Sequence, residues 1–217
     1  MSLPYVDALK VADFFKPEFY GACLEGYCQI AGGLRRCKSA VHDIEYVLKP
    51  LDKKPPLKFG MKPKDVPQTM LDVVLMDLEK EDYLSFKQGD KKNKKYFVNL
   101  LKFNLVHVDG FLLDLWICTP PAQFGVQMVI RTGPQSVSNN FSQWTVTNRS
   151  AGGALPDGYR VKFGAVWLAD QLDSKGKPHE NEQPLPMSDE KHFLDFLGIT
   201  AKPQDRRAEW GKYLKRA

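Results

Sequence analysis

The stretch from Ala31 to Leu48 decides the fold of this chain, and it reads AGGLRRCKSAVHDIEYVL. Asp43 and Glu45 lie two residues apart in an apolar, β-branched run. Successive side chains of a strand alternate between faces, so a strand here carries both carboxylates on one face of a sheet. Two like charges this close repel each other unless a divalent cation lies between them. We therefore expect a strand with a metal-binding face.

A third acid, Asp114, stands in a second strand-like run, FLLDLWI from Phe111 to Ile117. An acid in so apolar a strand costs free energy unless it has a partner. Gly32 and Gly33 precede all three acids, and glycines at a strand-to-helix junction let backbone N–H groups approach phosphate oxygens. The alternatives are solvated strand acids and a plain tight turn. The combination favours a site for hard cations and a triphosphate.

Five motifs in order make this interpretation specific. They are GGLRR (32–36), DIE (43–45), LDLWICTPPAQFGVQMVIRTG (113–133), HFLDFLG (192–198) and PQDR (203–206). Together they resemble the catalytic half of a family X DNA polymerase, within the nucleotidyltransferase superfamily. The similarity runs from about Val11 to Arg206 and covers the catalytic palm and thumb only.

The resemblance implies an activity, a set of cofactors and a set of site residues. The activity is addition of nucleotides to a DNA 3′-hydroxyl, with two Mg²⁺ (or Mn²⁺) ions, one activating that hydroxyl and one holding the triphosphate. The implied metal ligands and catalytic residues are Asp43, Glu45 and Asp114; the implied nucleotide-binding residues are Gly32, Gly33, Arg36, Arg131, Thr132 and Gly133.

Several positions depart from the family pattern or carry a further expectation. Glu45 and Gly33 stand where better-known members have aspartate and serine. Ser138 and Ser142 stand where they have template-reading asparagine and arginine, which leaves template dependence open. For Arg35 we favour an internal ion pair, whereas Arg131 can face either the sugar or a phosphate. The family has a cis peptide at the position of Gly133–Pro134, and we expect it here, since cis is far less costly before proline.

The fold class expected is α+β. Residues 1–120 would form a palm, a mixed sheet with helices on one face and the three carboxylates on the other, and residues 121–217 a smaller α+β thumb. Hydrophobic spacing and turn residues predict the elements. Expected helices are Val6–Tyr27 (kinked or divided in two at Pro17), Thr69–Glu79 (with Thr69 as N-cap), Phe124–Ile130, Ser138–Trp144 and Asp189–Leu197. Expected strands are Cys28–Ala31, one ending at Leu48, those within Tyr159–Ala169, and two hairpins, Tyr83–Lys87 with Lys95–Leu100 and Val106–Val108 with Phe111–Cys118.

Composition permits these expectations without requiring them. The chain of 217 residues has a net charge of +5, a mild bias that allows nucleic acid as a partner. The four cysteines form no C-x-x-C pair, so a zinc site is not expected and a reducing, cytoplasmic compartment is. No apolar run approaches the roughly 20 residues of a membrane span. We expect a monomer whose partners are primed or gapped DNA and a nucleoside triphosphate, with no membrane.

Two alternative functions remain open. One is a nucleotidyltransferase that uses the same carboxylates on a non-DNA acceptor, which the loss of serine at Gly33 and of the template-reading residues favours. The other is a non-catalytic nucleic-acid-binding descendant, which three clustered, mutually repelling acids argue against. The basic stretch Lys87–Lys95 is either a solvated hairpin tip or a phosphate-binding element.

Overall fold

The computed structural model describes residues 2–52, 69–86, 95–100, 111–135, 138 and 154–199, with the backbone alone at Phe86 and residues 95–100. This part of the chain is of mixed α+β class. It divides into two compact units, one formed by Met1–Ile30 with Lys38–Ile117 and the other by Ala31–Cys37 with Cys118–Ala217. The second unit therefore contains the glycine-arginine segment, which lies within the residues 1–120 expected to form the palm.

The first unit is built on a five-stranded mixed sheet. Its strands lie in the order β2 (Cys23–Ile30), β4 (Asp43–Pro50), β7 (Phe111–Ile117), β6 (Lys95–Leu100) and β5 (Leu84–Phe86). The β4–β7 pair is parallel, and the other pairs are antiparallel. The first unit also contains a separate short antiparallel pair, β1 (Leu3–Pro4) with β3 (Ala40–Val41).

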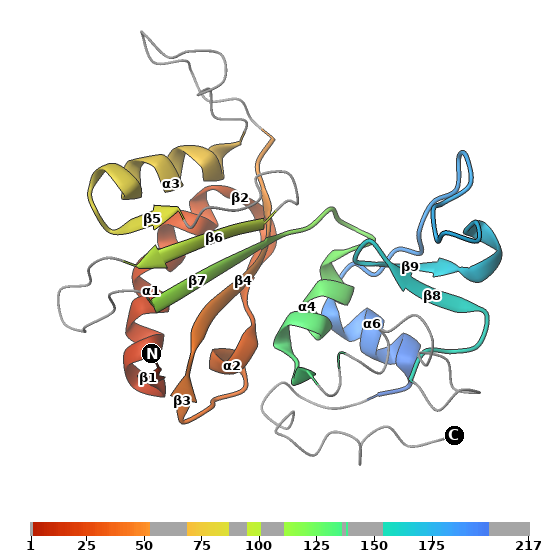
Figure 1. Ribbon diagram of the computed structural model, residues 1–217, viewed down its shortest axis with the longest axis horizontal. Helices are drawn as coiled ribbons and strands as arrows, with labels where there is room; N and C mark the ends of the chain where they lie inside the picture. Colours follow the sequence, from red (N-terminus) through yellow and green to blue (C-terminus); the bar gives the residue numbers. More distant parts are fainter. Residues whose placement is uncertain are drawn as a thin grey trace, which may run out of the picture. The chain divides into compact units, whose positions relative to one another are not determined.

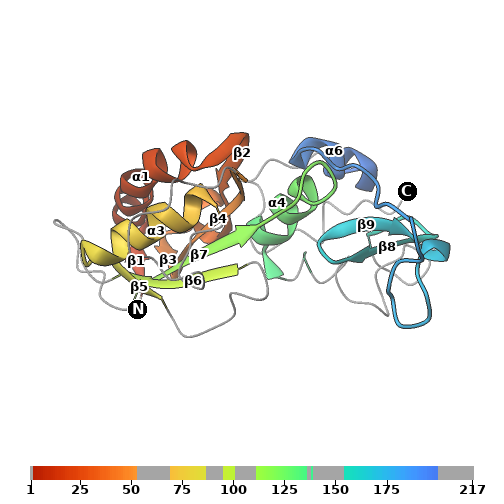
Figure 2. The same ribbon diagram turned by 90° about the horizontal axis from the view of Figure 1, so that it is seen from above.

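Two helices, α1 (Tyr5–Gly21) and α3 (Met70–Lys80), cover one face of this sheet (Figures 1 and 2). Tyr46 of β4 points to that face: its hydroxyl donates to the Ala12 carbonyl of α1 at 2.8 Å, and its ring meets Phe19 edge-on at 5.2 Å. Burial, with smaller contributions from the neighbouring Cys28, Tyr20 and Asp13, raises the pKa of Tyr46 far above its ordinary value. Side chains on β4 alternate, so Asp43 and Glu45 lie on the opposite face.

The start of α3 was predicted correctly and the end of α1 was not. Thr69 caps α3, where it and Asp72 form a reciprocal capping box. The expected helix to Tyr27 ends instead at Gly21, and Pro17 lies inside it without dividing it. Residues 23–30 form β2, because pairing with β4 buries Cys23 and Cys28 at the sheet.

The neighbour expected for the strand at Phe111 was also wrong. The two edges of β7 are taken by β4 and by β6, with Leu100 opposite Phe111. The expected partner Val106–Val108 lies outside the described residues, as do residues 139–144 of the expected helix, residues 87–94 of the basic stretch and the PQDR motif. The other expected hairpin is confirmed, since β5 pairs antiparallel with β6.

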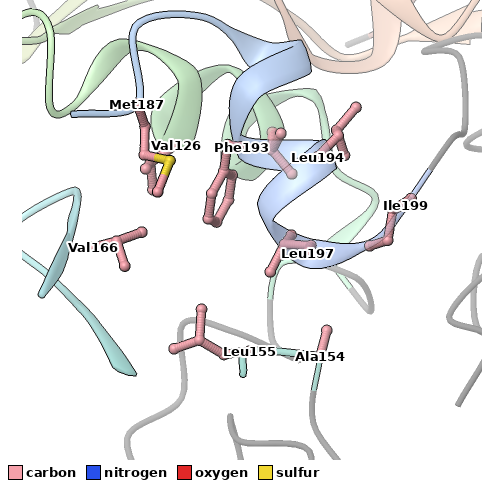
Figure 3. Close-up of a cluster of buried hydrophobic side chains, with 10 residues drawn as sticks. Val126, Ala154, Leu155, Val166, Met187, Phe193, Leu194, Leu197 and Ile199 are labelled. Carbon is pink, nitrogen blue, oxygen red and sulfur yellow. The ribbon is translucent and has the colours of Figure 1, made fainter. Parts of the chain in front are cut away.

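The second unit packs helices and a hairpin around its own core. It contains α2 (Gly32–Arg35), α4 (Phe124–Thr132), β8 (Tyr159–Lys162), β9 (Ala165–Leu168), a short 3₁₀ turn η4 (Ala169–Gln171) and α6 (Glu190–Leu197). Figure 3 shows side chains from α4, β9 and α6 turned toward one another, with the Phe193 ring among them. The core members include Val126, Leu155, Val166, Met187, Phe193 and Leu197.

Local signals predicted this unit well. The helix expected at Asp189–Leu197 is α6, and the Asp189 carboxylate caps it by accepting the His192 N–H at 2.8 Å. The strands expected within Tyr159–Ala169 are the β8–β9 hairpin. The helix expected at Phe124–Ile130 is α4, which runs on to Thr132. The Gly133–Pro134 peptide is cis, as predicted, and so is Pro120–Pro121, which was not predicted.

The turn of the β8–β9 hairpin is unusual. It consists of Phe163 and Gly164, with φ of +52° and +75°. Two positive φ values are what a two-residue hairpin turn of type I′ requires, and Asn, Asp or Gly is preferred at its first position. A side chain such as phenylalanine costs roughly 1–2 kcal/mol in the left-handed region. Phe163 is nevertheless 57% exposed, so burial offsets little of that cost.

Candidate active site

The three predicted carboxylates lie on the parallel β4–β7 pair. In its register Glu45 stands opposite Asp114, and Asp43 stands opposite Leu112. Paired residues of neighbouring strands point to the same face, and residues two apart on one strand do so as well. All three carboxylates therefore share the face that α1 and α3 leave uncovered. Strand spacing puts the Glu45 and Asp114 backbones about 4.8 Å apart and those of Asp43 and Glu45 about 6.6 Å apart.

These carboxylates differ in their access to solvent. Asp114 is buried, with 9% of its surface exposed, whereas Asp43 and Glu45 are half-buried. Among the described residues, no three His, Cys, Asp or Glu side chains are grouped as a ready metal site. The donor set itself suits a hard cation, because carboxylate oxygens are what Mg²⁺ and Mn²⁺ prefer. The three carboxylates thus share one face of the sheet, with Asp114 buried and the other two nearer solvent.

The glycine pair lies in the second unit, at the start of α2. The chain leaves β2, and Ala31 precedes the helix in an extended conformation. Gly32 has a φ of +67° and is buried, so this position requires glycine, whereas Gly33 does not adopt a positive φ. The expected strand-to-helix junction is therefore present. The helix has a single turn, with Arg36 as its C-cap.

Arg35 and Arg36 tie α2 to the rest of the second unit. Arg35 donates from Nη2 to Glu190 Oε2 at 2.6 Å and from Nη1 to Thr132 Oγ1 at 2.9 Å, which confirms the internal ion pair predicted for it. Arg36 is 7% exposed, and its Nη1 donates to the Thr132 carbonyl. The guanidinium predicted to bind phosphate thus contributes one donor to the backbone at the end of α4.

The other expected nucleotide-binding residues lie at the end of a helix. Arg131 and Thr132 form the last turn of α4, and Gly133 is its C-cap. Arg131 Nε donates to Gln127 Oε1 at 3.2 Å, and Thr132 is fully buried. Gly133 has a φ of +64°, and an added Cβ would lie 2.9 Å from Arg36 Nη1. Glycine therefore suits this position by its conformation, and a Cβ here would displace the Arg36 guanidinium.

The structure groups the predicted site residues into two sets. Asp43, Glu45 and Asp114 belong to the first unit; Gly32, Gly33, Arg36, Arg131, Thr132 and Gly133 belong to the second. Sequence reasoning missed Glu190 as the partner of Arg35, since the two are 155 residues apart and no local spacing links them.

Comparisons with known proteins leave the function to be argued from these residues. The chain matches no model of a known protein family and none of the curated proteins. Within the described part, none of the helices has the length and apolar character needed to cross a membrane.

Proposed function

We propose that this chain is a metal-dependent nucleotidyltransferase of the family X DNA polymerase type, which adds nucleotides to a DNA 3′-hydroxyl. The observation that supports it most is the β4–β7 register, because it sets Glu45 opposite Asp114 on the same face as Asp43. The resemblance implies that these three acids are the metal ligands and share a sheet face, and the β4–β7 register is an independent observation consistent with it. In the proposal the first unit is the palm and the second the thumb.

The carboxylates have the role of holding two divalent cations, Mg²⁺ or Mn²⁺, against their sheet face. When bound, such ions lower the pKa of the attacking hydroxyl and offset charge on the phosphates. Asp114 is buried on β7, so its carboxylate is held in place and suits the ligand that orients the acceptor hydroxyl. Asp43 and Glu45 are nearer solvent, which suits ligands shared with an incoming nucleotide.

The second unit has the role of binding the triphosphate. The first N–H groups of a helix have no acceptor within it, so those of Gly32 and Gly33 suit phosphate oxygens. Arg36 adds positive charge beside them and is fixed by its bond to the Thr132 carbonyl. Arg131, in the last turn of α4, is assigned to the sugar or a phosphate of the same nucleotide.

The test is a transfer assay on purified full-length chain. It combines Mg²⁺ or Mn²⁺, labelled deoxynucleoside or ribonucleoside triphosphates, and matched single-stranded, primed and gapped DNAs. We expect the wild-type protein to extend primed or gapped DNA, and we expect Asp43→Asn and Asp114→Asn each to abolish this extension. Glu25→Gln, which changes an exposed acid on β2, is the matched control and should extend DNA normally. Labelling of a non-DNA acceptor would favour the other transferase, and absence of transfer to every acceptor would refute the proposal.

Gly33 offers a second, sharper test of the triphosphate role. Serine is compatible with its backbone because its φ is not positive, and the added hydroxyl can donate to a phosphate. Gly33→Ser should lower the KM for nucleotide about two- to tenfold, the range of one net hydrogen bond. Gly32→Ser, at a φ of +67°, should instead reduce stability. An unchanged KM for Gly33→Ser would remove the glycine pair from the site.

A further inference from the structure

The tip of the β8–β9 hairpin carries an exposed aromatic ring in a conformation that does not favour it. Phe163 is 57% exposed at a φ of +52°. Burial of a large apolar side chain can offset the free-energy cost of a strained backbone, but the Phe163 ring is mostly exposed. Outliers of this kind are concentrated at ligand-binding positions. Phenylalanine at position 163 therefore points to a function other than stabilising the hairpin.

The backbone that carries the ring is held by side-chain contacts. Gln123 Nε2 donates to the Phe163 carbonyl at 2.7 Å, and Trp167 Nε1 donates to the Lys162 carbonyl at 3.0 Å. Gly164 is packed against α4, since an added Cβ would lie 2.3 Å from Gln127 Nε2. Side chains thus fix the backbone on both sides of the ring. Because the backbone that carries the ring is already ordered, less conformational entropy is lost when a flat ligand stacks on the ring.

Two cationic side chains lie on the same hairpin as the ring. The hairpin, YRVKFGAVWL from Tyr159 to Leu168, has two cationic residues and no acidic one. Lys162 Nζ lies 5.9 Å from the centroid of the Phe163 ring. Tyr159 and Val161 pack against the core of the unit, so Arg160 and Lys162 lie on the opposite face of β8, where both are partly buried.

We propose that Phe163 is a stacking platform for an unpaired base of single-stranded nucleic acid, with Lys162 and Arg160 taking the adjacent phosphates. An aromatic ring next to cations on a rigid β-hairpin is the chemistry that binds single strands without sequence preference. Anchoring in a membrane needs a broader apolar face than one ring. The choice of partner rests on the proposed function, and the residues that carry it are separate from those assigned to transfer.

Asparagine at position 163 separates binding from folding. Asn is preferred at a positive φ and has no ring, so Phe163→Asn should leave the melting temperature unchanged or raise it. The affinity of Phe163→Asn for single-stranded DNA should be about 5- to 150-fold lower than that of wild type, the range for loss of one base–aromatic stack. Phe163→Trp should retain the affinity. Tyr20→Ala is the matched control, because Tyr20 is also an exposed ring, 46% exposed, with a lysine (Lys16) 5.5 Å from its centroid.

The experiment measures fluorescence anisotropy of a labelled thymidine oligonucleotide with full-length protein in EDTA, where transfer does not occur. A second oligonucleotide carries 2-aminopurine, whose quenching reports stacking; quenching by wild type and its loss in Phe163→Asn are expected. Lys162→Ala should reduce the salt slope by about 0.7, the value for one phosphate contact on a single strand. Wild-type affinity in Phe163→Asn, an equal loss in Tyr20→Ala, binding to anionic vesicles in place of DNA, or no binding of the oligonucleotide by wild type would each overturn the inference.

The outcomes distinguish this inference from the proposed function. If Phe163→Asn binds single strands normally while wild type extends primers, the platform is wrong and the transferase stands. If binding depends on Phe163 while no nucleotide is transferred to any acceptor, the platform stands and the transferase is wrong.

Discussion

Replacement of Asp114 by asparagine tests the carboxylate face through stability as well as activity. Asp114 is buried opposite Glu45, and asparagine keeps its shape and polarity while removing its charge. In metal-free protein the change removes repulsion from Glu45 and, at longer range, from Asp43. We therefore expect Asp114→Asn to be more stable than wild type in EDTA, although it should lose transfer activity.

The strand spacing sets the size of this effect. Two unit charges about 4.8 Å apart repel by about 0.9 kcal/mol in water and by about 3.5 kcal/mol at an effective dielectric constant near 20. The setting of a buried Asp114 beside a half-buried Glu45 lies between these limits. A chain of this length gains about 2–4 °C in melting temperature for each kcal/mol. The expected rise is therefore between about 2 °C and about 14 °C.

Thermal unfolding with and without Mn²⁺ measures both parts of this prediction. Metal at a hundredfold excess over its dissociation constant should stabilise wild type by about 2.7 kcal/mol. Asp114→Asn should show a much smaller shift, and Glu25→Gln should behave as wild type in both conditions. Destabilisation of Asp114→Asn in EDTA, together with a full Mn²⁺ shift, would refute the reasoning and make Asp114 a structural residue.

Two further predictions concern packing. Tyr46→Phe removes the hydroxyl that donates to the Ala12 carbonyl, and should lower the free energy of unfolding by about 0.5–1.5 kcal/mol in denaturant titrations. Because the folded-state pKa of Tyr46 is raised, the stability that its neutral hydroxyl contributes is complete below the unfolded pKa near 10 and is lost as pH rises beyond it. The free energy of unfolding of wild type should therefore fall with pH there, by up to about 1.4 kcal/mol per pH unit, and the fall should be smaller in Tyr46→Phe. An identical slope in both proteins would contradict the assignment. Gly133→Ala should lower the free energy of unfolding more than Gly158→Ala. Both glycines have a positive φ, but a Cβ at position 133 would press on Arg36, whereas a Cβ at position 158 meets nothing within 4 Å. Equal losses in denaturant titrations would show that Arg36 simply moves aside.

Local patterns predicted local structure in this chain. Thr69 and Asp189 marked helix starts because a side-chain oxygen there accepts a backbone N–H, a contact that spans three residues. The alternation around Ile44 predicted that Asp43 and Glu45 share a face, since a strand has a period of two. In each case the sequence neighbourhood holds all the partners.

Pairings between distant segments could not be predicted in the same way. The expected helix to Tyr27 failed because residues 23–30 are stabilised by β4, some 20 residues on, which helical periodicity does not detect. The Arg35–Glu190 ion pair joins residues 155 apart. For Asp114, the apolar run around it predicted a strand and the resemblance implied a role, whereas the register against Glu45 comes from the structure alone.

The division of the chain has a practical consequence for anyone who wishes to express its parts separately. The second unit is discontinuous: it includes Ala31–Cys37, inserted from within the first unit. A fragment cut at Cys118 would leave Arg35 and Arg36 behind, and with them the donors to Thr132 and Glu190. A faithful excised version would need that segment grafted back through a linker, so gene truncation at the apparent boundary is the wrong way to isolate it.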